Sequence, residues 1–379
     1  MSQRFALTGA RILAGGHWLD GHAVIVDGAM IEGIVPAAAL DPAITTHRLN
    51  GGALVPGFID IQVNGGGGVL FNDAPTVAGI TAIAAAHRKF GTTAMLPTLI
   101  SDDLSIVARA IAAVDEAIAQ GVPGIIGIHI EGPFLNAAKR GIHDAAKFRV
   151  LDADAVALLS SLKRGKTLVT LAPECAPPGM IAALVKRGVI VSAGHTLASY
   201  DDMQRAIAEG LSGVTHLFNA MTQMEGRAPG VVGAALESGL FCGIIADGHH
   251  VHGAALRVAY RALGAERLML VTDAMPSVGA PLKPFKLGDT EITLKDGALR
   301  AADGTLAGSH LDMAGAVRNA TSLLNAIDSD AYKMASDTPT HFLGVANKYG
   351  NISDGYRADL IHVNNDLRVQ STWIAGRPA

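Results

Sequence analysis

The sequence predicts an α/β protein whose main part is a (β/α)8 (TIM) barrel, with a small β domain built from both ends of the chain. Three observations predict this fold. Eight short apolar runs rich in Val, Ile and Leu recur between positions 55 and 273, and Ala-rich segments with helical spacing separate them. The runs are apolar almost throughout, as is typical of parallel strands covered on both faces. The two ends of the chain instead alternate short strand-like pieces with Gly and Asp turns.

The eight apolar runs give the barrel strands in order. The predicted strands are 55–63, 92–99, 124–131, 167–174, 188–195, 213–219, 242–249 and 268–273. Eight βα units in about 300 residues match the usual size of such a barrel. We therefore assign residues 55–350 to the barrel.

The terminal segments, 1–54 and 351–379, contain strand-like pieces such as Ala23–Val26. Each piece alone is too small to bury a core, and paired strands need partners. We therefore expect the two segments to meet in one small β domain.

A further β segment interrupts the chain after the eighth strand. Residues 285–309 carry turn signals at Asp296-Gly297 and Asp303-Gly304. They predict a β-hairpin insertion on the face of the barrel where loops carry function.

Composition argues against several classes of partner. The 379 residues include 30 basic and 34 acidic ones, for a net charge of -4, and no basic run suits nucleic acid. No stretch approaches the ~18 uninterrupted apolar residues of a membrane span. The chain starts without the apolar core of a signal peptide, and two cysteines cannot build a disulfide framework. We expect a cytoplasmic protein.

Polar residues stand at the ends of the apolar runs. They are Gln62, Asn64, His129, Glu131, Glu174, His195, His216, Asn219, Asp247, His249, His250 and Asp273. The C-terminal ends of barrel strands form the active site in this fold. Burying this many polar groups on one rim costs free energy unless each finds a hydrogen-bond partner. The pattern therefore predicts an active site there.

Two histidines and a carboxylate among these residues suit a metal ion. His195 and His216 are separated by one βα unit, and Glu131 ends the third strand. In known enzymes, a set of two histidines and one carboxylate holds catalytic zinc with one position open for water. The same set holds iron in non-haem oxygenases. Asp273 on the last strand can act as a general base, which favours hydrolysis.

A family resemblance rests on longer segments. They are PGFIDIQVNG (56–65), HIEGPFL (129–135), SAGHT (192–196), THLFNAM (215–221) and VTDAM (271–275), in this order across nearly the whole chain. Together they resemble the amidohydrolase superfamily. The resemblance implies a metal-dependent (β/α)8 barrel with a small β-sandwich made from both termini. It also implies hydrolysis of the acetamide of an amino-sugar phosphate to acetate and the free amine.

One departure from the superfamily bears on the number of metal ions. Many members carry a His-x-His pair at the end of strand 1 and bind two metals, whereas this chain has Gln62 and Asn64. Amides are poor zinc ligands, and we expect these two to hydrogen-bond neighbouring ligands. The fourth run ends with Glu174 and offers no lysine that could bridge two ions. We predict one divalent metal ion per subunit, with zinc as the first choice and iron, cobalt or manganese as alternatives. The predicted ligands are Glu131, His195 and His216.

The resemblance also implies roles for residues around the metal. His143 would donate to the acetyl carbonyl oxygen, and Asp273 would move a proton from the attacking water to the amine. Arg227 would hold the phosphate from across a subunit interface, which implies a homodimer or a dimer of dimers. The other expected substrate contacts are Ile142, Asn219, Ala220, Asp247, Gly248, His249, His250, Leu306, Ala307 and Gly308. Among His249, His250 and His252, the pattern Gly-His-His-Val favours His250.

Two other functions stay open. The chain could act on a different acylated amine, such as N-acetylgalactosamine 6-phosphate or an acyl amino acid. It could also be a barrel that has lost catalysis and serves as a binding protein, although the intact ligand set and Asp273 argue against this.

Overall fold

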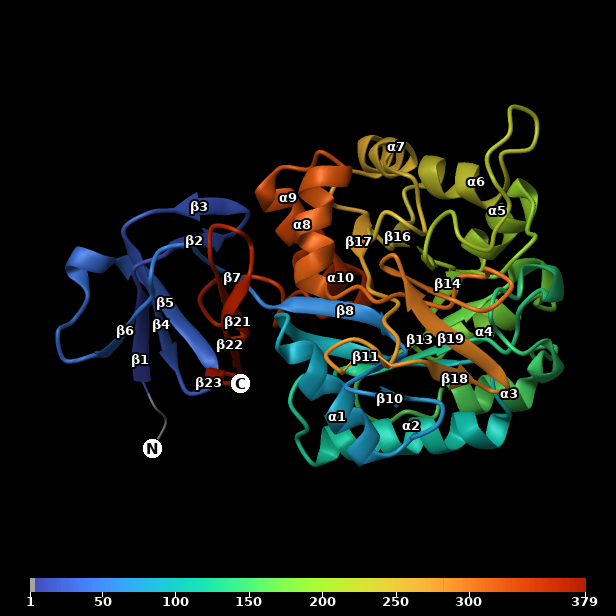
Figure 1. Cartoon of the computed structure of the whole chain (residues 1–379), viewed down its shortest axis with the longest axis horizontal. Helices are drawn as coiled ribbons and strands as arrows, with labels where there is room; N and C mark the ends of the chain where they lie inside the picture. Colours follow the sequence, from blue (N-terminus) through green and yellow to red (C-terminus); the bar gives the residue numbers. More distant parts are fainter. Residues whose placement is uncertain (1–3, 282) are drawn as a thin grey trace.

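The computed structural model describes residues 4–281 and 283–379, which form a barrel and a smaller β domain beside it (Figure 1). The barrel is an eight-stranded sheet in which every neighbouring pair of strands is parallel. Its strands are β8 (Phe58–Val63), β11 (Thr92–Ile100), β12 (Gly127–Glu131), β13 (Lys166–Leu171), β14 (Ile190–Ala193), β15 (Gly213–Val214), β16 (Phe241–Ile244) and β17 (Leu268–Leu270). Spatial order follows chain order, so the predicted (β/α)8 barrel is confirmed.

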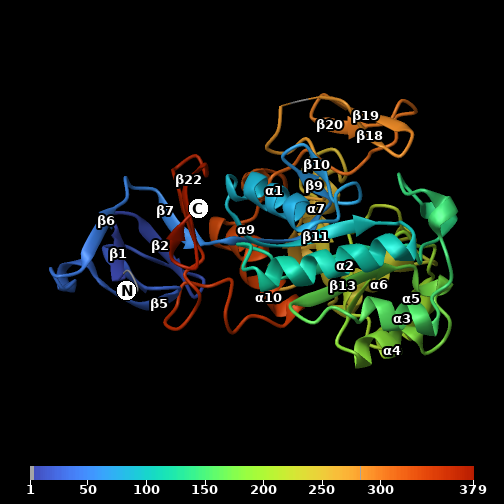
Figure 2. The ribbon, with the colours of Figure 1, turned by 90° about the horizontal axis from the view of Figure 1, so that it is seen from below.

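Helices follow each barrel strand and cover the outside of the sheet (Figure 2). They are α1 (Val77–Arg88), α2 (Leu104–Ala119), α3 (Ala153–Leu159), α4 (Met180–Lys186), α5 (Tyr200–Ala208), α6 (Gly230–Ser238), α7 (Gly253–Leu263), α8 (Met313–Leu323), α9 (Asp328–Ala335) and α10 (Asp337–Leu343). Short 3-10 turns are η1 (Ala37–Ala39), η2 (Ala137–Lys139), η3 (Ala145–Lys147) and η4 (Pro173–Cys175). Strands covered in this way are buried on both faces, and every residue of β8 is buried, including the polar Asp60 and Gln62. No helix in the described part of the chain is long and apolar enough to cross a membrane.

The barrel closes between its first and last strands, β8 and β17. The Asp273 backbone N–H donates to the Gln62 carbonyl at 2.9 Å, and the Thr272 hydroxyl donates to Asp60 Oδ2 at 2.5 Å. Asp60 lies wholly inside the barrel, and this burial raises its pKa to about 7. The closing contacts therefore lie just below the rim that carries the polar residues.

The β domain contains two sheets built from both ends of the chain. One sheet joins β2 (Arg11–Ala14), β3 (His17–Leu19), β7 (Ala53–Pro56), β21 (Leu360–Val363), β22 (Val369–Ile374) and β23 (Arg377–Pro378). The other joins β1 (Arg4–Thr8), β4 (His22–Asp27), β5 (Met30–Pro36) and β6 (Thr45–Arg48). Phe5, Leu54 and Trp373 share one buried apolar cluster. Strands from both termini thus pack together in one small β domain, as the sequence predicts.

One predicted strand, 55–63, is in fact two strands in different sheets. β7 pairs with β2 and β21 in the β domain, whereas β8 belongs to the barrel. Gly57 lies between them, and a Cβ atom there would stand 2.0 Å from Thr93 Oγ1. The close approach of β11 requires glycine at the point where the chain passes from one sheet to the other.

The insertion is a three-stranded antiparallel sheet of β18 (Phe285–Leu287), β19 (Thr290–Lys295) and β20 (Ala298–Arg300). It lies over the short hairpin of β9 (Gly65–Gly66) and β10 (Val69–Leu70), as Figure 2 shows. Leu70 and Met275 pack against apolar residues of the inserted sheet. The chain then returns past the mouth of the barrel on its way to α8.

Candidate active site

A cavity of about 330 Å³ opens at the C-terminal ends of the barrel strands. The loop after β12 and the segment after β20 complete its walls. Its lining residues are Asn64, Ile100, Glu131, Ala138, Lys139, Gly141, Ile142, His143, His195, His216, Asn219, Ala220, Ile245, His250, Asp273, Met275, Thr305, Leu306 and Gly308. The cavity therefore lies on the rim where the sequence predicts the site.

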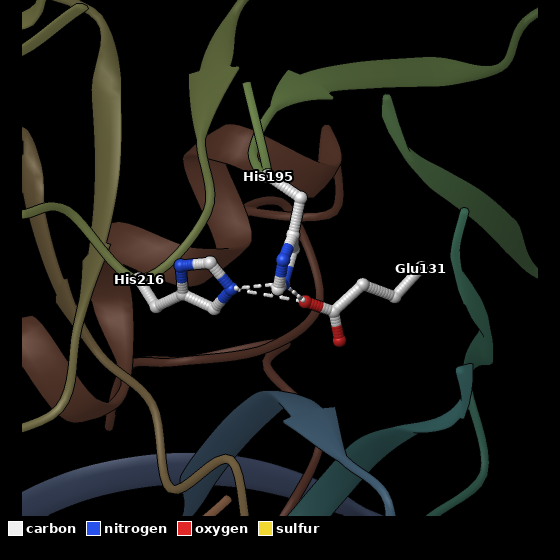
Figure 3. A group of neighbouring side chains, drawn as sticks. All are labelled: Glu131, His195 and His216. Atoms are coloured by element: carbon white, nitrogen blue, oxygen red, sulfur yellow. Dashed lines mark hydrogen bonds and ion pairs between the residues drawn. The ribbon is translucent and has the colours of Figure 1, made fainter. Parts of the chain in front are cut away.

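Glu131, His195 and His216 line this cavity, and their side chains point toward one another (Figure 3). The Nε2 atoms of His195 and His216 lie 3.1 and 3.0 Å from Glu131 Oε1, and 3.0 Å from each other. All three side chains are buried. Within the described residues this is the one group of His, Cys, Asp and Glu side chains found close enough to share a metal ion.

The donor atoms of this group fit a divalent cation. His195 Nδ1 lies 2.8 Å from the Lys139 carbonyl oxygen, which can only accept a hydrogen bond. The ring proton is therefore on Nδ1, and Nε2 presents a lone pair to its neighbours. Imidazole nitrogens and a carboxylate oxygen converging on one point are a zinc-type ligand set, with a carbonyl orienting one ring from behind.

The backbone at the ends of the strands is bent to aim these side chains inward. His195, His216 and Asp273 all have positive φ angles, of 50°, 35° and 51°. Non-glycine residues adopt this left-handed conformation at an energetic cost, and such residues cluster at active sites. The bend also explains why β15 ends at Val214, earlier than the predicted strand 213–219.

Charge at the ligand set is balanced locally. Burial works to raise the pKa of Glu131, but the adjacent His195 and His216 rings, whose Nε2 atoms lie 3.1 and 3.0 Å from its Oε1, hold that pKa well below its ordinary value. Glu131 is thus a carboxylate at neutral pH, as a metal ligand must be.

Asp273 is held by the amides of Gln62 and Asn64, which stand where many superfamily members carry a His-x-His pair. Its Oδ1 accepts from Asn64 Nδ2 at 2.6 Å and from Gln62 Nε2 at 3.2 Å, and Gln62 Nε2 also reaches Glu131 Oε2 at 3.2 Å. The expectation that these amides hydrogen-bond neighbouring ligands is confirmed for Gln62, which reaches Glu131, whereas Asn64 bonds Asp273, which is not one of the predicted ligands. Burial and the nearby Glu131 charge raise the pKa of Asp273 to about 6. Because both bonds end on Oδ1, Oδ2 is the oxygen left to take a proton.

His143 lies in the loop between η2 and η3, with its ring centroid 4.4 Å from that of His195. Its Nδ1 lies 2.8 Å from Ser101 Oγ. Burial and the adjacent His195 lower the pKa of His143 to about 3. The ring is therefore neutral and can serve as a hydrogen-bond donor in the cavity.

The structure brings most of the other predicted contacts to the cavity. The lining includes Ile142, Asn219, Ala220, His250, Leu306 and Gly308. His250 Nδ1 is bonded to Asp247 Oδ2 at 2.6 Å, so Asp247 stands behind the histidine.

Besides Asp247, four predicted contacts lie outside the cavity lining. Gly248 and His249 are exposed beside the cavity, and Ala307 is buried in the apolar cluster of the inserted sheet. Arg227 is exposed and lines a separate hollow of about 670 Å³. Lys139 lines both this hollow and the cavity, so the two adjoin.

Sequence reasoning missed Lys139, Thr305 and Met275 as lining residues. Lys139 sits in the loop that also carries His143, so a basic residue close to the HIEGPFL segment was the available signal. Met275 ends the VTDAM segment, which was the available signal, whereas no local signal marks Thr305, because only the fold of the insertion brings it to the cavity.

Two strand-end residues serve the scaffold. Glu174 accepts hydrogen bonds from Asn136 Nδ2 at 3.0 Å and from the Leu197 N–H at 2.6 Å, which ties two rim loops together. His129 lies in the barrel interior, 2.8 Å from Thr170 Oγ1, and burial lowers its pKa to about 4. Their polar groups are satisfied within the fold.

Comparisons with known proteins agree with this geometry. Residues 53–379 match the amidohydrolase family, and residues 4–54 match the NagA composite domain. An N-acetylgalactosamine-6-phosphate deacetylase from Shewanella sp. (strain ANA-3) is 45% identical over 97% of this chain and 94% of its own length. An N-acetylglucosamine-6-phosphate deacetylase from Haemophilus influenzae is 33% identical over 94% of each chain. The crystal structure of N-acetylglucosamine-6-phosphate deacetylase from Pasteurella multocida superposes with a TM-score of 0.96 at 34% identity, covering 99% of both chains. The chain therefore belongs to the amidohydrolase family.

Proposed function

We propose that this protein hydrolyses the acetamide of N-acetyl-D-glucosamine 6-phosphate to D-glucosamine 6-phosphate and acetate, in the breakdown or recycling of amino sugars. The observation that carries the proposal is one cavity in which a buried Glu131, His195 and His216 set stands beside Asp273 and His143. The Haemophilus and Pasteurella relatives are N-acetylglucosamine-6-phosphate deacetylases that match almost the whole chain. A cavity of about 330 Å³ is also of a size suited to a small ligand.

We assign one divalent metal ion per subunit to Glu131, His195 and His216, with zinc first and iron, cobalt or manganese as alternatives. A bound ion would supply Lewis-acid polarisation of the amide carbonyl and make water more acidic. The amides at Gln62 and Asn64 support a single ion, because both are engaged with Asp273.

The protein's own residues move the protons. Asp273 Oδ2 accepts a proton from the attacking water and returns it to the nitrogen of the departing amine. His143 donates through Nε2 to the carbonyl oxygen as negative charge develops there. A buried, neutral donor suits this role because it stabilises the oxyanion without reorganisation.

Phosphate recognition and assembly go together in the proposal. Asn219, Ala220 and His250 face the cavity and would hold the sugar phosphate. Arg227 lines a hollow of its own instead of the cavity, which supports a homodimer or dimer of dimers in which Arg227 reaches the neighbouring site. We place the reaction in the cytoplasm. The free thiols of Cys175 and Cys242 support this, because cysteines stay reduced in that compartment.

The proposal has a direct test. Acetate release is measured from N-acetylated glucosamine and galactosamine, each with and without a 6-phosphate, after reconstitution with defined metals. We expect the highest kcat/KM with N-acetylglucosamine 6-phosphate. Equal turnover of the unphosphorylated sugars would contradict the phosphate assignment, and no release from any substrate would overturn the function.

A second substrate is N-acetylgalactosamine 6-phosphate, favoured by the Shewanella relative at 45% identity. The two substrates differ only in the configuration at C4, and the same panel separates them. A higher kcat/KM for the galacto epimer would replace the gluco assignment and leave the chemistry unchanged.

A further inference from the structure

We propose that Ser101 is a positioning residue that fixes the tautomer of His143, so that the ring proton stands on Nε2 and faces the substrate. This inference rests on the proposed role of His143 as a donor to the acetyl carbonyl. It adds a residue that no strand-end motif marks.

Ser101 reaches His143 from the strand next to the metal ligand. It follows Ile100, the last residue of β11, which lies opposite Glu131 of β12. Its Oγ lies 2.8 Å from His143 Nδ1, and its backbone nitrogen lies 3.3 Å from the same atom. Both residues are buried, at 8% and 4% exposure, so water does not compete for these contacts.

The backbone contact indicates that Nδ1 is the acceptor, and the shorter hydroxyl contact, 2.8 Å against 3.3 Å, supplies the stronger bond that holds the ring in this tautomer. A peptide N–H can only donate, so the Nδ1 atom that faces it presents a lone pair. The Ser101 hydroxyl rotates freely and can donate to the same lone pair. A neutral imidazole has one ring proton, which must then be on Nε2. The opposite tautomer would aim a lone pair at the carbonyl oxygen and repel the negative charge that develops there.

A glycine leaves the space that the Ser101 hydroxyl occupies. Gly132 follows Glu131 with φ +85°, and a Cβ atom there would stand 2.3 Å from Ser101 Oγ. The Glu131 carbonyl oxygen, 3.4 Å away, is the other acceptor within reach of the hydroxyl. Gly132 thus leaves room for the Ser101 hydroxyl, which lies between the Glu131 backbone and the His143 ring.

The kinetic test uses the full, metal-loaded protein with Ser101→Ala and Ser101→Cys. We expect Ser101→Ala to lower kcat by about 10–100-fold, the usual cost of losing an orienting partner, with KM within about twofold. The metal content should not change. Ser101→Cys keeps a weak donor of similar shape and should be intermediate. A kcat within about twofold of the unsubstituted protein in Ser101→Ala would overturn the proposal.

A matched control is Ser336→Ala. Ser336 is also buried and donates to the Tyr332 carbonyl at 2.7 Å, between α9 and α10 and outside the cavity lining. It should keep the full kcat. A drop equal to that of Ser101→Ala would mean that any lost buried hydroxyl weakens the enzyme, and this would overturn the specific role of Ser101.

The tautomer can be measured without a Ser101 variant. Nitrogen NMR of the full protein labelled with 15N-histidine should show His143 with a protonated Nε2 and a bare Nδ1, the signals being assigned by their loss in His143→Asn. A protonated Nδ1 would overturn the proposal even if Ser101→Ala failed to fold. Full activity in His143→Asn would overturn the role of His143 and with it that of Ser101, whereas loss of activity in His143→Asn with unchanged activity in Ser101→Ala would overturn only the role of Ser101.

Discussion

At the scale of single residues, the site differs from a two-metal centre at Gln62 and Asn64. Their amide groups bind one oxygen of Asp273 at 3.2 and 2.6 Å. Positions that offer imidazole ligands in many other members of the superfamily therefore orient the proposed general base here. The proposed base keeps one oxygen free of these amides, and its pKa of about 6 suits a group that accepts a proton near neutral pH.

Replacing Asp273 with Asn tests the base. We expect kcat to fall by several orders of magnitude, because an amide cannot accept the proton, while the metal stays bound because no ligand is changed. The measurements are steady-state kinetics and metal analysis. The exposed Asp366→Asn is the matched control and should keep full activity. An active Asp273→Asn enzyme would contradict the assignment.

Replacing Asn64 with Ala tests the orientation of that base. The variant loses the 2.6 Å bond to Asp273 Oδ1, so we expect kcat to fall about 10–100-fold at constant metal content. The loss should be much smaller than in Asp273→Asn, because the carboxylate remains. A wild-type kcat would show that Gln62 alone holds the base.

At the scale of elements, the junction of β8 and β17 combines closure of the barrel with placement of the site. Asp60 and Thr272 join the two strands inside the barrel, and one residue further on Asp273 bonds the Gln62 carbonyl. A carboxylate with no cation to compensate it is costly in such a place. Burial accordingly raises the pKa of Asp60 from 3.8 to about 7.

This shift predicts how stability varies with pH. Between about pH 4 and 7 the folded protein holds the Asp60 proton and the unfolded chain does not, so folding is favoured by low pH. The contribution is complete below pH 4 and is lost as the pH rises through 7. Asp60→Asn removes this contribution. Between pH 5 and 8 the free energy of unfolding of the variant should therefore fall by about 3 kcal/mol less than that of the parent protein.

Denaturant unfolding of both proteins at the two pH values measures the difference. Asp366→Asn, on the surface, should keep the parent's pH dependence. An identical pH dependence in Asp60→Asn and the parent would contradict the assignment of the buried proton.

At the scale of the whole molecule, the inserted sheet lies at the rim of the barrel, whereas the terminal β domain lies beside the barrel where β8 begins (Figures 1 and 2). The hollow that holds Arg227 adjoins the cavity through Lys139 but is separate from it. This arrangement suits an arginine that serves the site of a second copy.

Mixing two defective variants tests this assembly. If Arg227 acts across the interface, a dimer of one Asp273→Asn and one Arg227→Ala subunit contains one intact site, made of Asp273 from one chain and Arg227 from the other. After denaturation and refolding together in equal amounts, activity should return to about a quarter of the wild-type value, since random pairing makes half of the dimers mixed. Each variant refolded alone is the control. No gain above the two controls would show that Arg227 acts within its own chain.

The sequence by itself determined the barrel and the composition of its rim. Parallel strands covered on both faces must be apolar, so the eight runs stand out, and the polar residues that end them must share one rim. Glu131, His195, His216 and Asp273 were therefore predictable, and a long set of motifs indicated the family. Tertiary structure decided the rest. Only packing shows that Gly57 passes the chain between two sheets, that Ala307 turns into an apolar cluster, and that Ser101 meets Nδ1 of His143. These features depend on contacts between segments distant in sequence, and no local pattern of residues encodes such contacts.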